Sequence, residues 1–131
     1  MFLEIQKTAD ILARKLVPVL KSEDISATQY NVLRILRGSP QGLPCGEIAN
    51  RMITRDPDMT RLLDRMEKRG LISRTRDDED RRTVITRITV EGRELLARLD
   101  KPIHDAHRRQ FGHMSVAQLR DLARLLQAAR E

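Results

Sequence analysis

Arginines are the residues of this sequence whose types and spacing best suit binding to another molecule. Arg61 and Arg65 lie four residues apart, so one face of a helix would present both, and Arg81 and Arg82 lie in a short polar stretch. A guanidinium group is a fork of N–H donors that fits guanine O6 and N7 in the major groove of DNA, and also phosphate oxygens. The residue types and the net charge of +6 therefore favour an anionic partner that is contacted by individual arginines.

The overall composition argues against single-stranded nucleic acid and a membrane as the anionic partner. A chain of 131 residues, 40% of them hydrophobic, is long enough for one domain with a core. Aromatic residues make up only 2% of the chain, too few to provide stacking surfaces for single-stranded bases, which leaves duplex DNA open. No apolar run approaches the roughly 18 residues of a membrane span, and residues 1–16 mix both charges, unlike a signal or transit peptide. We therefore expect a cytoplasmic protein with no membrane partner.

Catalytic and metal-binding patterns are weak in this sequence. It contains no G-x-S-x-G, no phosphate-binding glycine loop and no H-E-x-x-H, so we expect neither an enzyme nor a cofactor. The single cysteine, Cys45, admits a redox-switch role at a helix start, but a small core residue is the favoured interpretation. His104 and His107 are three residues apart, with His113 nearby, a spacing that a metal site permits but that surface histidines also show. The favoured prediction is no metal site.

The elements that would position the arginines follow from hydrophobic periodicity and capping residues. The first segment is amphipathic, with an end or a kink expected near Lys15–Val17, ahead of Pro18. A second helix opens with a capping box formed by Ser26 and Gln29. It stops at Gly38, after which the chain turns.

Two further helices follow closely. A short helix is predicted from Pro44 to about Met52. The next is predicted over Pro57–Arg69, with Asp56 as N-cap and Gly70 as its left-handed end. Two short helices joined by a few residues form a helix-turn-helix, and the second one carries Arg61 and Arg65.

The remaining sequence predicts a hairpin and two more helices. Strands at 71–76 and 83–89, rich in β-branched residues, flank a polar tip at 77–81. A long helix follows Thr89, with a bend expected at Pro102, and a last helix starts at Ser115. A helix-turn-helix followed at once by a hairpin is the winged helix-turn-helix arrangement.

Residues 56–96 resemble the MarR family of bacterial and archaeal regulators. The matching stretches are T-R-L-L-D-R-M-E-K-R-G-L at 60–71, D-R-R at 80–82 and I-T-V-E-G at 88–92; upstream, T-Q-Y-x-x-L at 28–33 also matches. The resemblance implies a mainly α fold with a small β-hairpin wing, assembled as an intertwined helical homodimer. It also implies a single MarR-like domain over 1–131, with dimerisation helices at 1–24 and 93–131 and the winged helix-turn-helix at 25–92.

The same resemblance implies which residues meet DNA. The helix from Pro57 would enter the major groove and Arg82 the minor groove, with Arg81 beside it. Acidic residues complicate this assignment: Asp58 is expected to stabilise the helix dipole, and one of the wing-tip acids at 77–80 to orient an arginine. Apart from the resemblance, Thr28, Arg55 and Arg74 are expected to hold phosphates. The expected DNA-binding residues are Thr28, Arg55, Pro57, Asp58, Thr60, Arg61, Arg65, Arg74, Arg81 and Arg82.

The function expected from these features is sequence-specific binding of double-stranded DNA by a transcriptional regulator. The expected form is a homodimeric repressor on a pseudo-palindromic operator, released by a small aromatic or apolar effector. Two alternatives remain at this stage: a winged-helix module that binds an acidic protein, and a metal-responsive repressor. The dependence of DNA affinity on salt, and the effect of a chelator, would separate the three.

Overall fold

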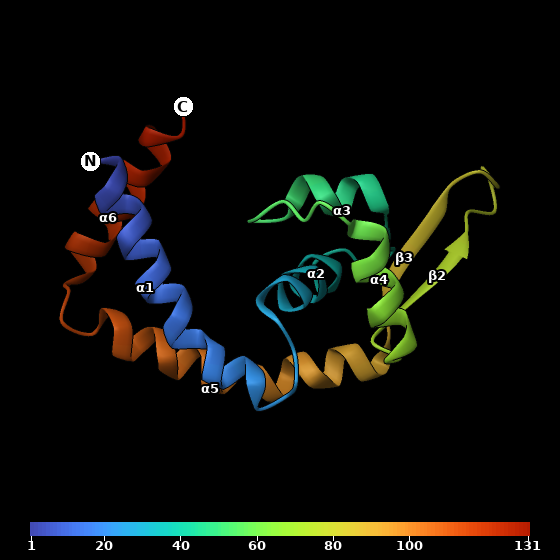
Figure 1. Ribbon diagram of the computed structural model, residues 1–131, viewed down its shortest axis with the longest axis horizontal. Helices are drawn as coiled ribbons and strands as arrows, with labels where there is room; N and C mark the ends of the chain where they lie inside the picture. The colour runs from blue at the N-terminus through green and yellow to red at the C-terminus, as the bar shows by residue number, and fades with distance from the viewer. The chain divides into compact units, whose positions relative to one another are not determined.

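The computed structural model describes residues 1–131 and contains six helices and one small sheet (Figure 1). The helices are α1 (Phe2–Lys21), α2 (Ala27–Arg37), α3 (Cys45–Arg51), α4 (Met59–Lys68), α5 (Val90–Phe111) and α6 (Val116–Ala129). The strands are β1 (Leu43–Pro44), β2 (Ile72–Arg76) and β3 (Val84–Ile88). No helix combines the length and the hydropathy that crossing a bilayer requires.

The chain divides into two compact units. One consists of residues 17–100, and the other of residues 1–16 together with 101–131. The division falls within α1 and within α5, so each of these helices contributes to both units.

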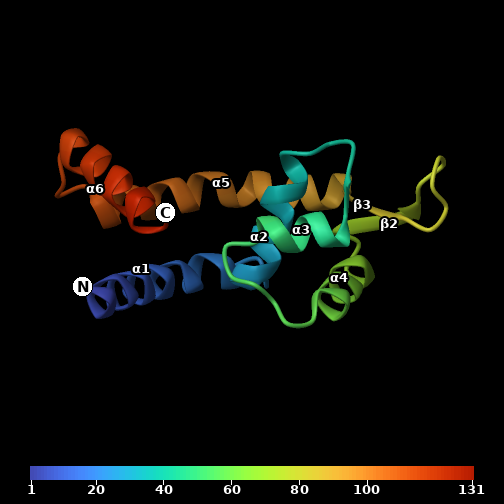
Figure 2. The same ribbon diagram turned by 90° about the horizontal axis from the view of Figure 1, so that it is seen from above.

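The 17–100 unit contains α2, α3, α4 and the three strands, which are the elements of a winged helix-turn-helix. Its antiparallel sheet has the order β1-β3-β2, with Leu43 opposite Thr86 and Ile72 opposite Ile88. Figure 2 shows β2 and β3 extending side by side to the tip of the hairpin. Apolar side chains of the helices and the sheet meet in one core, where the fully buried residues include Val32, Leu33, Leu36, Ile48, Leu63, Met66, Ile72, Leu96 and Leu99. Burial of these side chains is the main term that stabilises the unit.

The other unit is formed by parts of three helices. Ile103 and Ala106 of α5 are buried, and the buried Gln110 amide donates a hydrogen bond of 2.9 Å to the Leu12 carbonyl oxygen of α1. α6 has an apolar stripe but contributes no buried residue. Phe2, at 69% exposed, and Leu125, at 56%, leave large apolar surfaces open in this unit.

Most of the predicted helix ends are confirmed. Ser26 and Gln29 form the capping box of α2, and Ser115 and Gln118 form that of α6. The Thr89 hydroxyl accepts a hydrogen bond of 3.1 Å from the Gly92 amide at the start of α5. These side chains satisfy amide groups that a helix start otherwise leaves without partners.

Two predicted helix ends near prolines differ from the structure. α1 does not end near Lys15–Val17 but continues through Pro18 to Lys21. Pro18 lacks the N–H that would bond the carbonyl of residue 14, yet the turn beyond it buries Leu20, and this packing stabilises the last turn. Pro44 does not begin α3, because it belongs to β1, which pairs with β3 before the helix starts at Cys45.

Candidate nucleic-acid interface

The start of α4 is fixed by two consecutive aspartate turns. The Asp56 carboxylate accepts a hydrogen bond of 2.8 Å from the Asp58 amide, and the Asp58 carboxylate accepts one of 3.0 Å from the Arg61 amide. Asp58 is therefore the N-cap, and the prediction that Asp56 caps a helix beginning at Pro57 was wrong. Asp56 does not cap the helix because its carboxylate instead bonds the Asp58 amide and forms an Asx turn before the helix.

The capped helix presents one polar face and one apolar face. Met59, Leu62, Leu63 and Met66 are buried against the rest of the unit. The exposed face begins in the first turn, where backbone amides and the positive end of the helix dipole also lie. The exposed candidates on or just before this helix are Arg55, Pro57, Asp58, Thr60, Arg61 and Arg65.

The wing is attached to α4 by Arg74. This β2 guanidinium donates hydrogen bonds of 2.5 Å to Asp64 and 2.9 Å to Glu67, and the Arg74 amide donates one of 3.1 Å to Glu67. Hydrogen bonding from Arg74 lowers the pKa of Glu67, and bonding to Glu67 and then Asp64 raises the pKa of Arg74. The Arg74 side chain, 23% exposed, is thus occupied by two carboxylates within the protein and holds the hairpin against the helix.

The tip of the wing is organised by one carboxylate. Asp80 accepts hydrogen bonds from the Arg82 amide at 3.1 Å, from Arg82 Nε at 3.4 Å and from the Thr83 hydroxyl at 3.2 Å. These bonds, the one from the Arg82 amide first, lower the pKa of Asp80. The Arg82 side chain is nevertheless 93% exposed, so it is directed by Asp80 without being covered. The expectation that a wing-tip acid orients an arginine is confirmed for Asp80.

Arg81, an expected DNA contact, is bonded to Arg76, which was not expected to contact DNA. Arg81 is exposed at the tip, and its carbonyl oxygen accepts a hydrogen bond of 2.8 Å from Arg76 Nη1. Arg76 itself was not among the expected contacts, although it is exposed at the end of β2 beside the tip. Its position as the last strand residue before the polar turn could have predicted this contact with the tip.

Thr28 belongs to α2 and not to α4 or the wing. It is the second residue of α2, half-buried, with its hydroxyl 3.0 Å from that of Ser26. The other nine expected residues belong to the segment 55–82, and all ten lie in the 17–100 unit.

The residues considered for sensing do not form a cluster. Cys45 is a free thiol at the first position of α3 and is partly exposed. His104 and His107 line a small pocket of about 360 Å³ in the other unit, and His107 Nδ1 lies 3.3 Å from Gln110 Oε1. No three His, Cys, Asp or Glu side chains are placed to hold a metal ion.

The fold and the exposed arginines define a winged helix-turn-helix protein, and comparisons with known proteins give the family. The sequence profile of the MarR family matches residues 25–84. The homoprotocatechuate degradative operon repressor of Escherichia coli is 29% identical over 84% of this chain and 74% of its own length. The MarR transcription factor of Planctomyces limnophilus is 38% identical, with a TM-score of 0.74, over 97% of this chain and 93% of that one. The repressor CouR, solved on a 23-mer DNA duplex, is 26% identical, with a TM-score of 0.87, over 100% of this chain and 92% of its own.

The chain belongs to the MarR family of transcriptional regulators. The alignment with the Planctomyces limnophilus protein covers 93% of that protein, and the resemblance to the MarR family predicted from the sequence is confirmed.

Proposed function

We propose that this protein is a homodimeric transcriptional repressor that binds a pseudo-palindromic operator in duplex DNA. In each subunit α4 enters the major groove with its first turn, and the wing tip enters the adjacent minor groove. The observation that carries the proposal is the exposure of Arg61 on the first turn of α4 and of Arg82 at the wing tip, within one compact unit. The proposal includes a cytoplasmic location and no catalytic activity.

The individual residues have different roles in this proposal. Arg61 reads base edges, because it is exposed where the helix begins, and Thr60 and Pro57 lie against the same groove. Arg55 and Arg81 hold phosphates on either side. Asp58 acts through the helix start that it caps, and Arg74 acts by holding the wing.

Dimerisation is supported by the apolar surface of the second unit. No residue of α6 is buried, although Val116, Leu122, Leu125 and Leu126 form a stripe along it. A helix of 14 residues is marginal in water unless its apolar face is packed. A second copy of the chain would cover this stripe and the exposed residues at the start of α1, consistent with the dimerisation segments 1–24 and 93–131.

The wing arginine gives the sharpest test of DNA binding. The Arg82→Ala substitution removes an exposed guanidinium but keeps the backbone bond to Asp80, so the folded state is little affected. We expect operator affinity, measured by fluorescence anisotropy at fixed salt, to fall at least about tenfold with an unchanged melting temperature.

A matched control is available in the same unit. Arg93 is exposed near the start of α5, and no ion pair joins it to the rest of the protein. The Arg93→Ala substitution removes the same charge from the protein, and we expect operator affinity to change by less than about twofold. Equal losses for the two variants would show that net charge, and not the wing, determines affinity.

A further inference from the structure

The tip of the wing, residues 77–83, takes its shape from hydrogen bonds within the hairpin. In Figures 1 and 2 the tip projects beyond the helices of its unit, and no other element lies beside it. The Thr83 amide donates a hydrogen bond of 2.9 Å to the Asp80 carbonyl oxygen. The four residues from Asp80 to Thr83 therefore form a turn, and Arg81 and Arg82 are its two central residues.

One peptide group joins the two arginines, and side chains hold it at both ends. Its carbonyl oxygen belongs to Arg81 and accepts a hydrogen bond of 2.8 Å from Arg76 Nη1. Its N–H belongs to Arg82 and donates a hydrogen bond of 3.1 Å to Asp80 Oδ1. A cation therefore bonds the negative end of the peptide dipole and an anion bonds the positive end, so both hydrogen bonds are charge-assisted.

The orientation of this peptide group decides where the two arginine side chains point. Because the peptide bond is planar, the group can turn only through ψ of Arg81 and φ of Arg82, and this rotation moves the two Cα–Cβ bonds relative to each other. Such a rotation would break both of the side-chain hydrogen bonds. Arg76 supplies the only hydrogen bond to the Arg81 carbonyl oxygen, so one half of the restraint depends on a single side chain.

The Arg76 side chain has no other partner in the protein. Arg76 is the last residue of β2, it is exposed, and no ion pair joins it to a carboxylate. Arg74, on the same face of the strand two residues earlier, is instead bound by Asp64 and Glu67 of α4. Arg74 therefore fixes the hairpin to α4, whereas Arg76 fixes the tip of the hairpin to its own strand.

We propose that Arg76 is a positioning residue for DNA binding, a role that rests on the proposed function of the wing. Its hydrogen bond holds the peptide group in the orientation that directs Arg82 into the minor groove and Arg81 beside it. Ordering exposed side chains on binding costs free energy. Arg76 lowers this cost because the turn that carries the two arginines is already fixed in the DNA-free protein.

The first test measures the DNA affinity of the intact protein by fluorescence anisotropy. The probe is a duplex that the wild-type protein has selected from a random pool, and the salt concentration is fixed. We expect Arg76→Ala to weaken binding about fivefold, as the loss of one exposed charge-assisted hydrogen bond allows. The melting temperature should not change, because Arg76 is exposed and is not part of the core.

Arg87 provides a matched control in the same hairpin. It is exposed on β3, and its side chain likewise makes one hydrogen bond to a neutral oxygen, 2.9 Å to Thr75 Oγ1, and no ion pair. Arg76 is paired with Val84, three residues before Arg87, so the two arginines lie on opposite faces of the hairpin. We expect Arg87→Ala to change the affinity by less than about twofold.

The second test asks whether Arg76 acts through the two wing arginines or touches DNA itself. Arg76→Ala is introduced into a variant that already carries Arg81→Ala and Arg82→Ala, and all affinities are compared at one lower salt concentration, where binding is stronger. If Arg76 acts by positioning, its substitution should change the affinity of this variant by less than about twofold, because the residues that it positions are gone. In the DNA-free protein, NMR relaxation should show a more mobile Arg82 amide in Arg76→Ala and an unchanged one in Arg87→Ala.

Three results would overturn the role of Arg76. Equal losses for Arg76→Ala and Arg87→Ala would show that the charge of the hairpin determines affinity. A full loss that persists without Arg81 and Arg82 would show that Arg76 contacts DNA directly. Unchanged affinity of Arg76→Ala, for a duplex that the wild-type protein binds specifically, would reject the positioning role alone. A wild-type protein that selects no duplex would instead reject the proposed function, and with it the role of Arg76 in DNA binding.

Discussion

An arginine in a wing can hold the wing against the rest of the protein or contact a DNA phosphate, and substitution of Arg74 tests which of the two it does. Its guanidinium is 23% exposed, whereas the Asp64 and Glu67 side chains that it binds are 49% and 39% exposed. Partly exposed pairs each contribute about 0.2–1 kcal/mol, so the two together contribute about 1 kcal/mol after allowance for solvent screening. The Arg74→Ala substitution also leaves two neighbouring carboxylates on α4 without their shared cation.

The assay for Arg74 combines thermal unfolding with a salt titration of operator affinity. We expect Arg74→Ala to lower the melting temperature by roughly 4 °C, the shift that about 1 kcal/mol gives for a chain of this size. Operator affinity should fall because the wing is held less firmly, but the slope of log affinity against log salt should not change. The Arg82→Ala substitution should do the opposite, with unchanged melting and a slope reduced by about 1. Unchanged melting with a reduced slope for Arg74→Ala would refute the account of Arg74 as a structural link.

Three further predictions concern stability. Asp58→Ala should destabilise the protein by about 1 kcal/mol through loss of the N-cap, whereas Asp58→Asn should cost little, and chemical denaturation would show whether the two differ. Gly92→Ala should strongly lower the melting temperature, because the new Cβ would lie 2.3 Å from a main-chain carbonyl oxygen, while Gly46→Ala, with nothing within 4 Å, serves as the control that should not. The pKa of Glu67 is lowered in the folded state, so its pair with Arg74 stabilises the protein above the ordinary value of 4.5 and stops doing so as the pH falls through the lowered value. The stability difference between wild type and Arg74→Ala should accordingly be constant near neutral pH and shrink below about 4.5, and a difference that grows in acid would contradict this.

Local signals in the sequence were sufficient for most of the fold. Capping residues such as Ser26 and Ser115, and the glycine at 70 with its φ of 74°, act over three or four residues, so their effect can be read from the sequence. The change from helical to alternating periodicity likewise located the hairpin. Exposed positions on a strongly amphipathic helix, such as Arg61, follow from the same local pattern.

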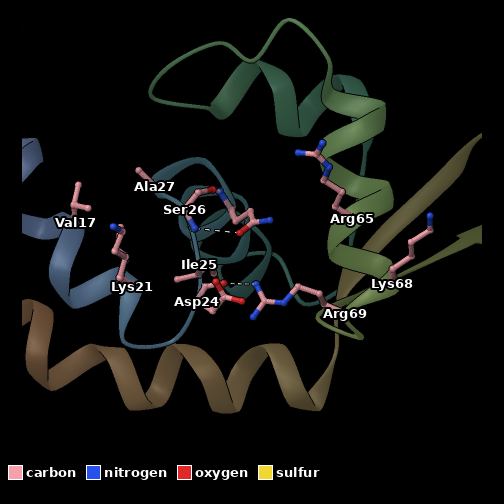
Figure 3. Close-up of a pocket in the computed structure, with 11 residues that line it drawn as sticks. Val17, Lys21, Asp24, Ile25, Ser26, Ala27, Arg65, Lys68 and Arg69 are labelled. Carbon is pink, nitrogen blue, oxygen red and sulfur yellow. Dashed lines mark hydrogen bonds between the residues drawn. The ribbon is translucent and has the colours of Figure 1, made fainter.

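Errors arose where distant residues decide the outcome. The cost of a proline within a helix is local, but the packing of Leu20 that offsets it depends on the other elements of the unit. The two-residue strand β1 is too short for any pattern and exists because it pairs with β3. The partners of Arg74 lie seven and ten residues away on another element, and their geometry depends on how the hairpin packs on α4. A pocket of about 720 Å³ beside α4 (Figure 3) could not be predicted for the same reason, since the residues that line it come from two separate segments, 17–29 and 65–69.

The most direct test of the central claim is selection of duplexes from a random pool by the purified wild-type protein, with Arg61→Ala treated in parallel. The account predicts one enriched pseudo-palindrome, with half-sites about one helical turn apart, bound by two chains per duplex. It also predicts that Arg61→Ala loses preference at base pairs of each half-site while retaining non-specific binding. Failure to enrich any sequence, or a single chain bound per selected duplex, would contradict it.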